Sequence, residues 1–336
     1  MNPMRRWLFC GLALVVMPAV AQQEVPVASL DQRQSGKIWF LSVEKSSSAF
    51  AIAEGKAKLA DPIFGLLEFP VKATGKVPAI VIAHSSAGVS AHDHDWAARL
   101  REIGLATFIV DSFSPRGVGP TMRDQSTINT TVNAADALVA LKLLSTHPAI
   151  DSARIAVIGW SRGGIVAIRT KLDPLRRSLA GDANRFAAHV ALYPFCESTV
   201  WSESMTPAPA LVIVGELDQY TAAGACRTLV ERMNARGANI RFEQIVGAHH
   251  GFDENQSAQW VGTIDSYSKC FIEQNVDDST FVRLDTGKPM TPNEVPGYLN
   301  SCRSMVGVNV GATAGSRERS IGEVTEFLKR TLFRGQ

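Results

Sequence analysis

The stretch Gly159-Trp160-Ser161-Arg162-Gly163 decides the fold of this chain. It follows an apolar run at residues 155–158 and precedes a helix-compatible run at residues 164–168. A strand, a tight turn and a helix in this order are the context of the G-x-S-x-G elbow, whose glycines permit the turn and whose serine hydroxyl stands at the end of a sheet. The start of a helix there also favours developing negative charge. The pattern therefore predicts that Ser161 is a nucleophile.

Strand-like and helix-like segments alternate on both sides of this turn. Strands are predicted at residues 64–71, 78–83, 106–110, 154–158, 187–193, 210–214 and 240–246, and helices at 92–103, 128–144, 163–172, 222–235 and 321–332. This alternation is typical of βαβ units, so we expect an α/β fold with a mainly parallel, doubly wound sheet covered by helices on both faces. In such sheets the functional residues gather in loops at the carboxyl ends of the strands.

A serine nucleophile needs a histidine base and an acid that orients this base. In α/β-hydrolases the three follow in the chain order serine, acid, histidine. The predicted strand at 210–214 is followed by Glu216 and Asp218, and the strand at 240–246 is followed by His249 and His250. We predict Asp218 as the acid, with Glu216 as the alternative. We predict His250 as the base because it precedes a flexible glycine, with His249 as the alternative.

The tetrahedral intermediate of such a reaction needs backbone donors for its oxyanion. One is expected to be the N–H of Arg162, which directly follows the nucleophile, and the other the N–H of Ser86 in the loop after the strand at 78–83. The side chain of Arg162 is expected at the surface or behind the catalytic groups. Trp160, beside the nucleophile, is assigned to substrate binding.

These motifs together resemble the dienelactone hydrolase family of the α/β-hydrolase superfamily. The resemblance spans about residues 60–253 and the closing helix at 321–333, and its carriers are the elbow and the segments 84–88, 110–117, 215–218 and 250–252. It implies an α/β-hydrolase fold and hydrolysis of carboxylic esters or lactones without a cofactor.

The chain departs from the prototype enzymes of that family at several positions. The prototypes use a cysteine nucleophile, a glutamate in the oxyanion loop and two arginines that clamp the carboxylate of the substrate. Here Ser161 takes the place of the cysteine and Ser85 that of the glutamate. Arg116 matches one arginine and is assigned to substrate binding, whereas Glu254 stands where the second would follow the histidine. A carboxylate beside Glu254 would be repelled, so we expect a serine-dependent relative with another substrate.

The chain of 336 residues begins with a segment that reads as an export signal. Residues 1–21 combine two arginines, a short apolar run and small residues before Gln22, and the apolar run is too short to span a bilayer. We therefore expect a periplasmic or secreted protein without a membrane anchor after cleavage. Residues 22–59 are assigned to an N-terminal extension and 60–336 to the hydrolase domain, in which the segment 255–320 lacks a clear period and is expected to be an accessory segment or lid.

Four cysteines follow the signal, and an even number in an exported protein indicates disulfides rather than free thiols. Cys196 and Cys226 lie near the ends of neighbouring predicted strands, and Cys270 and Cys302 bracket much of the accessory segment, so we predict the pairs 196–226 and 270–302. No C-x-x-C spacing occurs, and the His- and Asp-rich run at 92–95 reads as a helix start, so no metal site is predicted.

The formal net charge is +2, and it becomes zero without the two arginines of the signal. A neutral chain gives no electrostatic reason to expect nucleic acid as a partner. The expected partner is a small ester or lactone. An acyltransferase or a peptidase of the prolyl-oligopeptidase type would use the same triad, although the chain has no room for a propeller domain. The non-enzymatic alternative is a binding protein on a hydrolase scaffold.

Overall fold

The computed structural model of the chain describes residues 25–73 and 75–333. The predicted export signal at 1–21 lies outside these residues. In chain order the elements are β1 (Gly36–Val43), α1 (Ala49–Ala53), β2 (Leu59–Glu68), β3 (Val77–Ala83), α2 (Ala91–Glu102), β4 (Ala106–Asp111), the 3-10 turns η1 (Ser114–Arg116) and η2 (Gln125–Thr127), α3 (Thr130–Leu144), β5 (Ile150–Trp160), α4 (Arg162–Arg169), α5 (Asp173–Ala180), β6 (Ala188–Leu192), β7 (Ser198–Trp201), β8 (Ala210–Gly215), α6 (Ala223–Asn234), β9 (Ile240–Ile245), β10 (Gln259–Ser266), β11 (Ile272–Asn275), β12 (Thr280–Arg283), β13 (Pro289–Met290), α7 (Val295–Cys302), β14 (Ser304–Val310) and α8 (Ser316–Leu332). None of the helices in this part of the chain is both long and apolar enough to cross a bilayer.

An eight-stranded sheet forms the centre of the molecule, with the strand order β1-β2-β4-β3-β5-β6-β8-β9. From β4 to β9 all neighbours are parallel, whereas β2 runs antiparallel to both β1 and β4. The predicted α/β fold with a mainly parallel sheet is confirmed. The edge strand β1 lies within residues 22–59, where the sequence showed no clear strand pattern.

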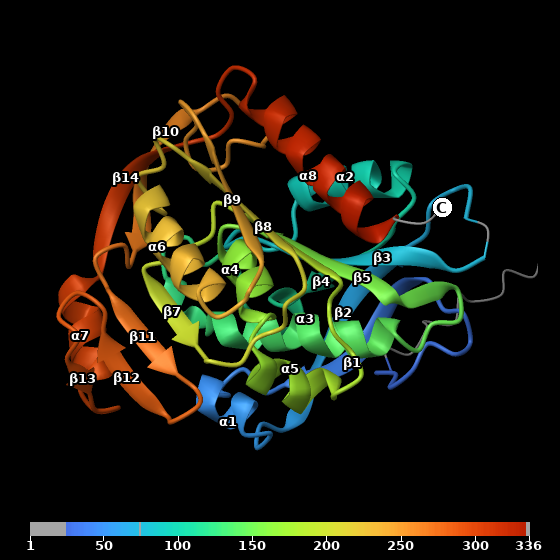
Figure 1. Ribbon diagram of the computed structural model, residues 1–336, viewed down its shortest axis with the longest axis horizontal. Coiled ribbons are helices and arrows are strands. Elements are labelled where there is room, and N and C mark those ends of the chain that lie inside the picture. The colour runs from blue at the N-terminus through green and yellow to red at the C-terminus, as the bar shows by residue number, and fades with distance from the viewer. Residues whose placement is uncertain (1–24, 74, 334–336) are drawn as a thin grey trace, which may run out of the picture.

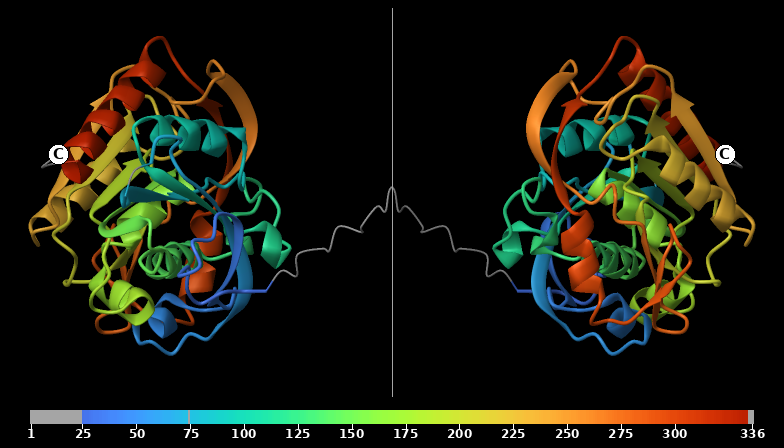
Figure 2. Two further views of the ribbon diagram at one scale, coloured as in Figure 1. Left: turned by 90° about the vertical axis from the view of Figure 1, so that its right-hand side faces the viewer. Right: turned by 90° about the vertical axis from the view of Figure 1, so that its left-hand side faces the viewer.

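Two apolar cores lie on opposite faces of this sheet because side chains alternate along each strand. In β3, for example, Val81 points to the core that contains α3, α4, α5 and α6, and its neighbours Ile80 and Ile82 point to the core beneath α2 and α8. Figure 1 shows α2 and α8 on one side of the sheet and α3, α4 and α5 on the other, and the end views of Figure 2 show the same layers. The parallel strands are therefore covered on both faces.

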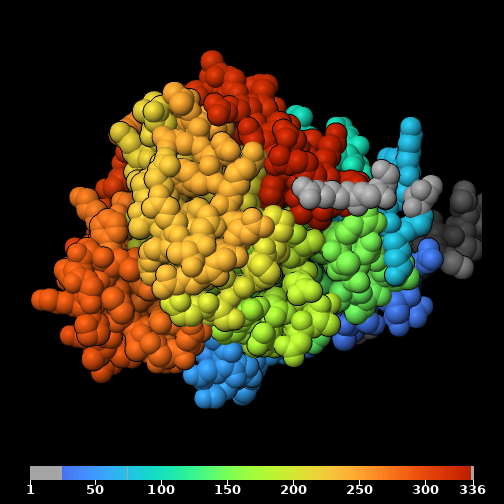
Figure 3. Space-filling view, viewed as in Figure 1, coloured from blue at the N-terminus to red at the C-terminus, as the bar shows by residue number. Residues whose placement is uncertain are grey.

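The segment 255–320 contains the strands β10 to β14, α7 and the start of α8. β10 pairs with β14. A second small sheet has the order β13-β12-β11-β7, and its strand β7 lies earlier in the sequence, before the segment 255–320. β11 runs parallel to β7, with Ile272 opposite Ser198. In Figure 1 β11, β12, β13 and α7 gather at one end of the molecule, and the space-filling view shows this orange segment packed against the yellow one (Figure 3). We call residues 255–310 the accessory wall.

Two disulfide bonds join these parts. Cys196 is bonded to Cys226 with a Cα–Cα distance of 4.9 Å, which links the chain after β6 to α6. Cys270 is bonded to Cys302 with a Cα–Cα distance of 5.3 Å, which closes the accessory wall around α7. The first bond lies beside the loop that carries Asp218, and the second is confined to the wall.

The turn between β5 and α4 is packed so tightly that two of its positions admit only glycine. A Cβ atom on Gly159 would overlap the carbonyl group of Gly163. A Cβ atom on Gly163 would overlap the carbonyl oxygen of Ala83, the last residue of β3. The start of α4 therefore touches the end of β3, and this contact brings the loop that carries Ser86 beside Ser161.

Substitution of Gly163 by Ala is expected to destabilise the protein by about 3 kcal/mol or more, because a methyl group would be forced into rigid backbone. Gly322→Ala is the matched control, since a Cβ atom at this position of α8 meets nothing within 4 Å. The control is expected to gain up to about 1 kcal/mol from helix propensity. Urea unfolding of both variants measures this difference, and equal midpoints would contradict the close approach.

Candidate active site

Ser161 occupies the turn between β5 and α4 in a conformation that serine rarely adopts. Its φ is 53° and its ψ is −113°, so the backbone is strained as the elbow motif requires. Its N–H donates to the carbonyl oxygen of Leu192 in β6, which holds the turn on the sheet. The hydroxyl Oγ lies 3.0 Å from Nε2 of His250. The strained turn thus points the hydroxyl at a histidine from a distant part of the chain.

His250 and Asp218 lie in the loops after β9 and β8, which are neighbours in the sheet. Nδ1 of His250 is 2.8 Å from Oδ2 of Asp218. The other carboxylate oxygen of Asp218 accepts hydrogen bonds from the N–H groups of Tyr220 and Thr221, each at 2.9 Å. Burial acts to raise the pKa of Asp218, but the charge and hydrogen bonds of His250 and Thr221 outweigh it and hold this pKa below its usual value. Asp218 therefore stays ionised beside the histidine.

The two alternative residues point elsewhere. Nδ1 of His249 lies 3.1 Å from the carbonyl oxygen of Leu217, and Oε2 of Glu216 accepts a hydrogen bond from the N–H of Gly247. These contacts link the two loops to each other. The structure thus brings Ser161, His250 and Asp218 together and uses Glu216 and His249 to fasten the loops that carry the last two.

The predicted oxyanion donors lie next to the serine. Ser86, Ser161 and Arg162 line the same cavity. The N–H of Arg162 belongs to the first residue of α4, so the helix itself offers no acceptor for it. Ser86 is held by its side chain, since its hydroxyl donates to Oε1 of Gln125 at 2.9 Å. Ser85, at the position of the prototype glutamate, caps its own loop by accepting from the N–H of Ala87.

Arg116 and Trp160 do not contact the cavity, so their assignment to substrate binding is corrected. The guanidinium of Arg116 donates to both carboxylate oxygens of Asp136, at 2.8 and 2.9 Å, and to Asp61 at 2.9 Å. Its side chain is 2% exposed, because it ties η1 to β2 and α3. Trp160 is fully buried in the core beneath α2 and α8, since the last residue of β5 points to that face of the sheet.

The sequence analysis did not identify Asp253, a buried carboxylate close to His250. Asp253 accepts hydrogen bonds from the hydroxyl of Tyr193 at 2.7 Å, from Nε1 of Trp96 at 2.8 Å and from Nε2 of His92 at 3.0 Å. Burial acts to lower the pKa of His92, but Asp253 and other nearby acids raise it to about 9. The ring of Tyr193 packs edge-on against His250, with centroids 4.6 Å apart. Asp253 therefore fixes the aromatic support of the histidine.

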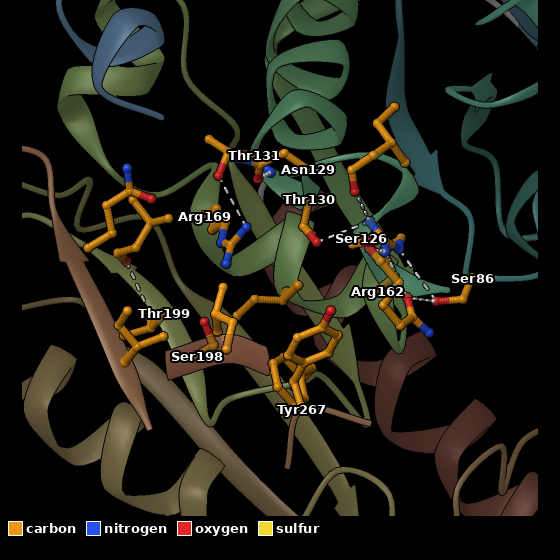
Figure 4. A pocket seen from close by; sticks show the side chains of 18 of the residues that line it. Ser86, Ser126, Asn129, Thr130, Thr131, Arg162, Arg169, Ser198, Thr199 and Tyr267 are labelled. Carbon is orange, nitrogen blue, oxygen red and sulfur yellow. Dashed lines mark hydrogen bonds between the residues drawn. The ribbon is translucent and has the colours of Figure 1, made fainter. Parts of the chain in front are cut away.

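The cavity at Ser161 has a volume of about 310 Å³. One side is formed by α4 and the start of α3, and the other by the accessory wall, including Tyr267, Phe281 and Leu299. Figure 4 shows Tyr267 and Ser198 facing α4 across this space. Within residues 25–73 and 75–333, no group of three His, Cys, Asp or Glu residues is placed to hold a metal ion.

A comparison with models of protein families identifies the family of this chain. A model of the dienelactone hydrolase family matches residues 63–278. The chain belongs to the dienelactone hydrolase family. The chain is therefore a carboxylic-ester hydrolase by class.

Individual relatives of this dienelactone hydrolase family member are distant. A Bradyrhizobium protein named "Probable 2-oxo-3-(5-oxofuran-2-ylidene)propanoate lactonase" is 23% identical over 189 residues, which cover 54% of this chain and 76% of the relative. A dienelactone hydrolase-like promiscuous phosphotriesterase from metagenomic libraries has a TM-score of 0.48 and 14% identity, with 88% of this chain and 99% of the other covered. A thermophilic esterase from Thermogutta terrifontis has a TM-score of 0.45 and 16% identity, over 56% and 79%. At these levels the two structures bear on neither substrate nor mechanism.

A second buried acid, Glu197, lies beside the loop of Asp218. Its carboxylate accepts hydrogen bonds from the N–H of Ala222 at 3.1 Å and from the N–H of Cys196 at 3.0 Å. It therefore connects the segment after β6 to the start of α6. Burial and, to a smaller extent, the charge of Asp218 raise the pKa of Glu197 to about 7, although its backbone hydrogen bonds act in the opposite direction. The folded protein therefore favours the protonated form of Glu197.

The stability of the protein is expected to depend on pH, because the pKa of Glu197 in the folded protein exceeds the value of about 4.3 for a glutamate in an unfolded chain. The contribution of Glu197 to stability is complete below about pH 4.3 and is lost as the pH rises through about 7. Glu197→Gln keeps an acceptor oxygen and does not titrate. The free energy of unfolding of the wild type, relative to this variant, is expected to fall by up to about 3 kcal/mol between pH 4 and pH 8. If the free energies of unfolding of the wild type and of Glu197→Gln changed equally with pH, the raised pKa of Glu197 would be contradicted.

Proposed function

We propose that this protein is an exported serine hydrolase that cleaves carboxylic esters or lactones through an acyl-enzyme, with Ser161, His250 and Asp218 as its catalytic triad. The observation that carries the proposal is the continuous contact from Oγ of Ser161 through His250 to Asp218, with distances of 3.0 and 2.8 Å. These distances are within the range that proton transfer requires. The contact opens onto a cavity that accommodates a small ester.

Acylation begins when Nε2 of His250 takes the proton of the Ser161 hydroxyl and Oγ attacks the carbonyl carbon of the ester. The negative charge that develops on the carbonyl oxygen is stabilised by the N–H groups of Ser86 and Arg162. The ionised Asp218 holds the proton on Nδ1 and stabilises the imidazolium that forms. The histidine then gives its Nε2 proton to the leaving alcohol, and the acyl group remains on Ser161.

Deacylation repeats these steps with water as the nucleophile. His250 removes a proton from a water molecule, which attacks the acyl carbon and releases the free acid and Ser161. In a lactone the alcohol is part of the same molecule, so one hydroxy acid leaves. The proton that His250 takes from water returns to Oγ of Ser161 as the acyl bond breaks. All protons thus move among this chain, the substrate and water, which is why the proposed reaction involves no cofactor.

Export is proposed on two features. The segment 1–21 has the sequence of an export signal, and the two disulfide bonds suit an oxidising compartment. N-terminal sequencing of the protein recovered from a periplasmic fraction or the medium tests this, and a chain that retains residues 1–21 in the cytoplasm would contradict it.

Ser161→Ala is expected to retain the fold and to lower kcat for p-nitrophenyl acetate by a factor on the order of 10⁴. The reason is that no other group replaces Oγ as the nucleophile. A fluorophosphonate probe is expected to label the wild type at Ser161, which peptide mass mapping locates. Retained turnover in the variant, or an adduct on another residue, would contradict the serine mechanism.

The adjacent histidines provide a matched pair of variants. His250→Ala is expected to reduce kcat about as much as loss of the serine, because triad members act as a unit, whereas His249→Ala is expected to cost less than about tenfold. Asp218→Asn and Glu216→Gln form a second pair with the same expected order. If the two histidine variants exchanged their effects, His249 would be the base and the geometry described here would not be the reactive one.

A further inference from the structure

Two arginines of α4 line the cavity beside the nucleophile. Arg162 and Arg169 are seven residues apart, so they lie on one face of the helix and about 10 Å apart along its axis. Figure 4 shows both side chains on the α4 side of the cavity, with Tyr267 and Ser198 across from them. Both residues are buried, with exposures of 5% and 7%. The cavity therefore has one arginine beside Ser161 and a second, Arg169, further along α4.

The partners of Arg162 are neutral oxygen atoms. Its Nη2 donates to the carbonyl oxygen and to Oε1 of Gln125, at 2.9 and 2.7 Å. Its Nη1 donates to the carbonyl oxygen of Ile128 at 3.0 Å and to Oγ1 of Thr130 at 3.1 Å. Burial lowers the pKa of Arg162 to about 10, so it remains a cation at neutral pH. Its hydrogen bonds are satisfied, but no carboxylate among residues 25–73 and 75–333 forms an ion pair with it.

Arg169 is less satisfied still. Its Nη1 donates to Oγ1 of Thr131 at 3.2 Å, whereas its buried Nε has no hydrogen-bond partner within residues 25–73 and 75–333. Burial and, to a smaller extent, the charge of Arg162 lower the pKa of Arg169 to about 9. A buried cation that lacks both a counter-ion and a full set of acceptors is costly, which points to an anion as its partner.

The carboxylate that lines the cavity does not fill this role. Asp265 is the only Asp or Glu among the lining residues of the described chain. It accepts hydrogen bonds from Nε and Nη2 of Arg303, at 2.7 and 2.9 Å, and from the N–H of Gln125 at 2.7 Å. Its charge is therefore paired with Arg303 of the accessory wall, and two cations of α4 remain uncompensated.

The surface between Ser161 and Arg169 is largely apolar. Ile165 lies between the two arginines on α4, and Val200, Ile272 and Leu299 line the same cavity. A hydrocarbon chain would find apolar contacts there, and an anionic group at its end would reach the guanidinium of Arg169. The cavity thus combines a reactive serine, an apolar passage and a cationic end.

We propose that the substrate is an ester with a free carboxylate several bonds away from the scissile carbonyl, and that Arg169, assisted by the charge of Arg162, binds this carboxylate. The inference rests on the proposed hydrolase function and adds the substrate class to it. The guanidinium supplies hydrogen bonds and charge to a carboxylate, which is the pairing this side chain favours. The site differs from the arginine clamp expected at Arg116, whose guanidinium is bound to Asp61 and Asp136.

The test compares two esters of equal chain length, mono-p-nitrophenyl suberate and p-nitrophenyl octanoate. The wild type is expected to hydrolyse the suberate with a kcat/KM at least about tenfold higher, as the strength of a charged hydrogen bond implies. Arg169→Gln is expected to reduce this ratio by about tenfold. Arg177→Gln is the matched control, because Arg177 has a side chain that is 60% exposed and lies outside the cavity, and it is expected to keep the wild-type ratio.

The outcomes separate the two proposals. Equal kcat/KM values of the wild type for both esters would overturn the carboxylate inference and leave the hydrolase function standing. A wild-type preference that persists in Arg169→Gln would overturn the role of Arg169. If Arg169→Gln does not fold, the wild type decides the matter with a third ester, p-nitrophenyl methyl suberate, in which the carboxylate is masked. Its kcat/KM is expected to lose the advantage over p-nitrophenyl octanoate, and an advantage that remains would overturn the carboxylate inference. No hydrolysis of any of these esters, without labelling of Ser161, would overturn both proposals.

Discussion

The contact between Gly163 and the carbonyl oxygen of Ala83 is the constraint on which the site depends. A helix begins there directly against the end of a buried strand, closer than any side chain allows. Because β3 and β5 are neighbours, this contact fixes the distance between the loop after β3 and the turn after β5. The packing of the backbone therefore positions the turn at Ser161 and the start of α4, and the hydrogen bond from Ser86 to Gln125 additionally holds the loop after β3. Two glycines, Gly159 and Gly163, make that packing possible.

The parallel sheet supplies the rest of the geometry. β8 and β9 are adjacent, so the loops that follow them place Asp218 and His250 within hydrogen-bond distance of each other. Support comes from both sides of the sheet: Glu197 and the Cys196–Cys226 bond hold the loop of Asp218, and Asp253 holds the ring of Tyr193 against His250. His250 is thus confined by polar contacts on one side and an aromatic ring on the other.

The sequence predicts those parts that arise from local pattern. Apolar runs identify the strands on both sides of Ser161, and loop residues after strand ends identify Asp218 and His250, because parallel strands deliver their carboxyl ends to one edge. Residues whose environment is set by distant contacts escape such reasoning. Arg116 matches in sequence a substrate-binding arginine of the prototype enzymes. Only its contacts with Asp61 and Asp136 reveal its structural role. Arg169 had a signal, the seven-residue spacing from Arg162, but its burial without a counter-ion is a property of the fold. Strands β11, β12 and β13 are short, and β10 and β14 leave most of their side chains at least partly exposed, so the apolar pattern of the sequence does not reveal them.

The pairing of β11 with β7 has a consequence for how such a protein diversifies. β7 belongs to the segment between β6 and β8, so its parallel pairing with β11 is one of the contacts that join the accessory wall to the rest of the protein. The family match ends at residue 278, within this wall, and leaves β12, β13, α7 and β14 outside it. Phe281 of β12 and Leu299 of α7 line one side of the cavity, and α4 lines the other. Changes in β12 and α7 can therefore reshape one side of the cavity while Ser161, Asp218 and His250, which the proposed mechanism uses, stay unchanged.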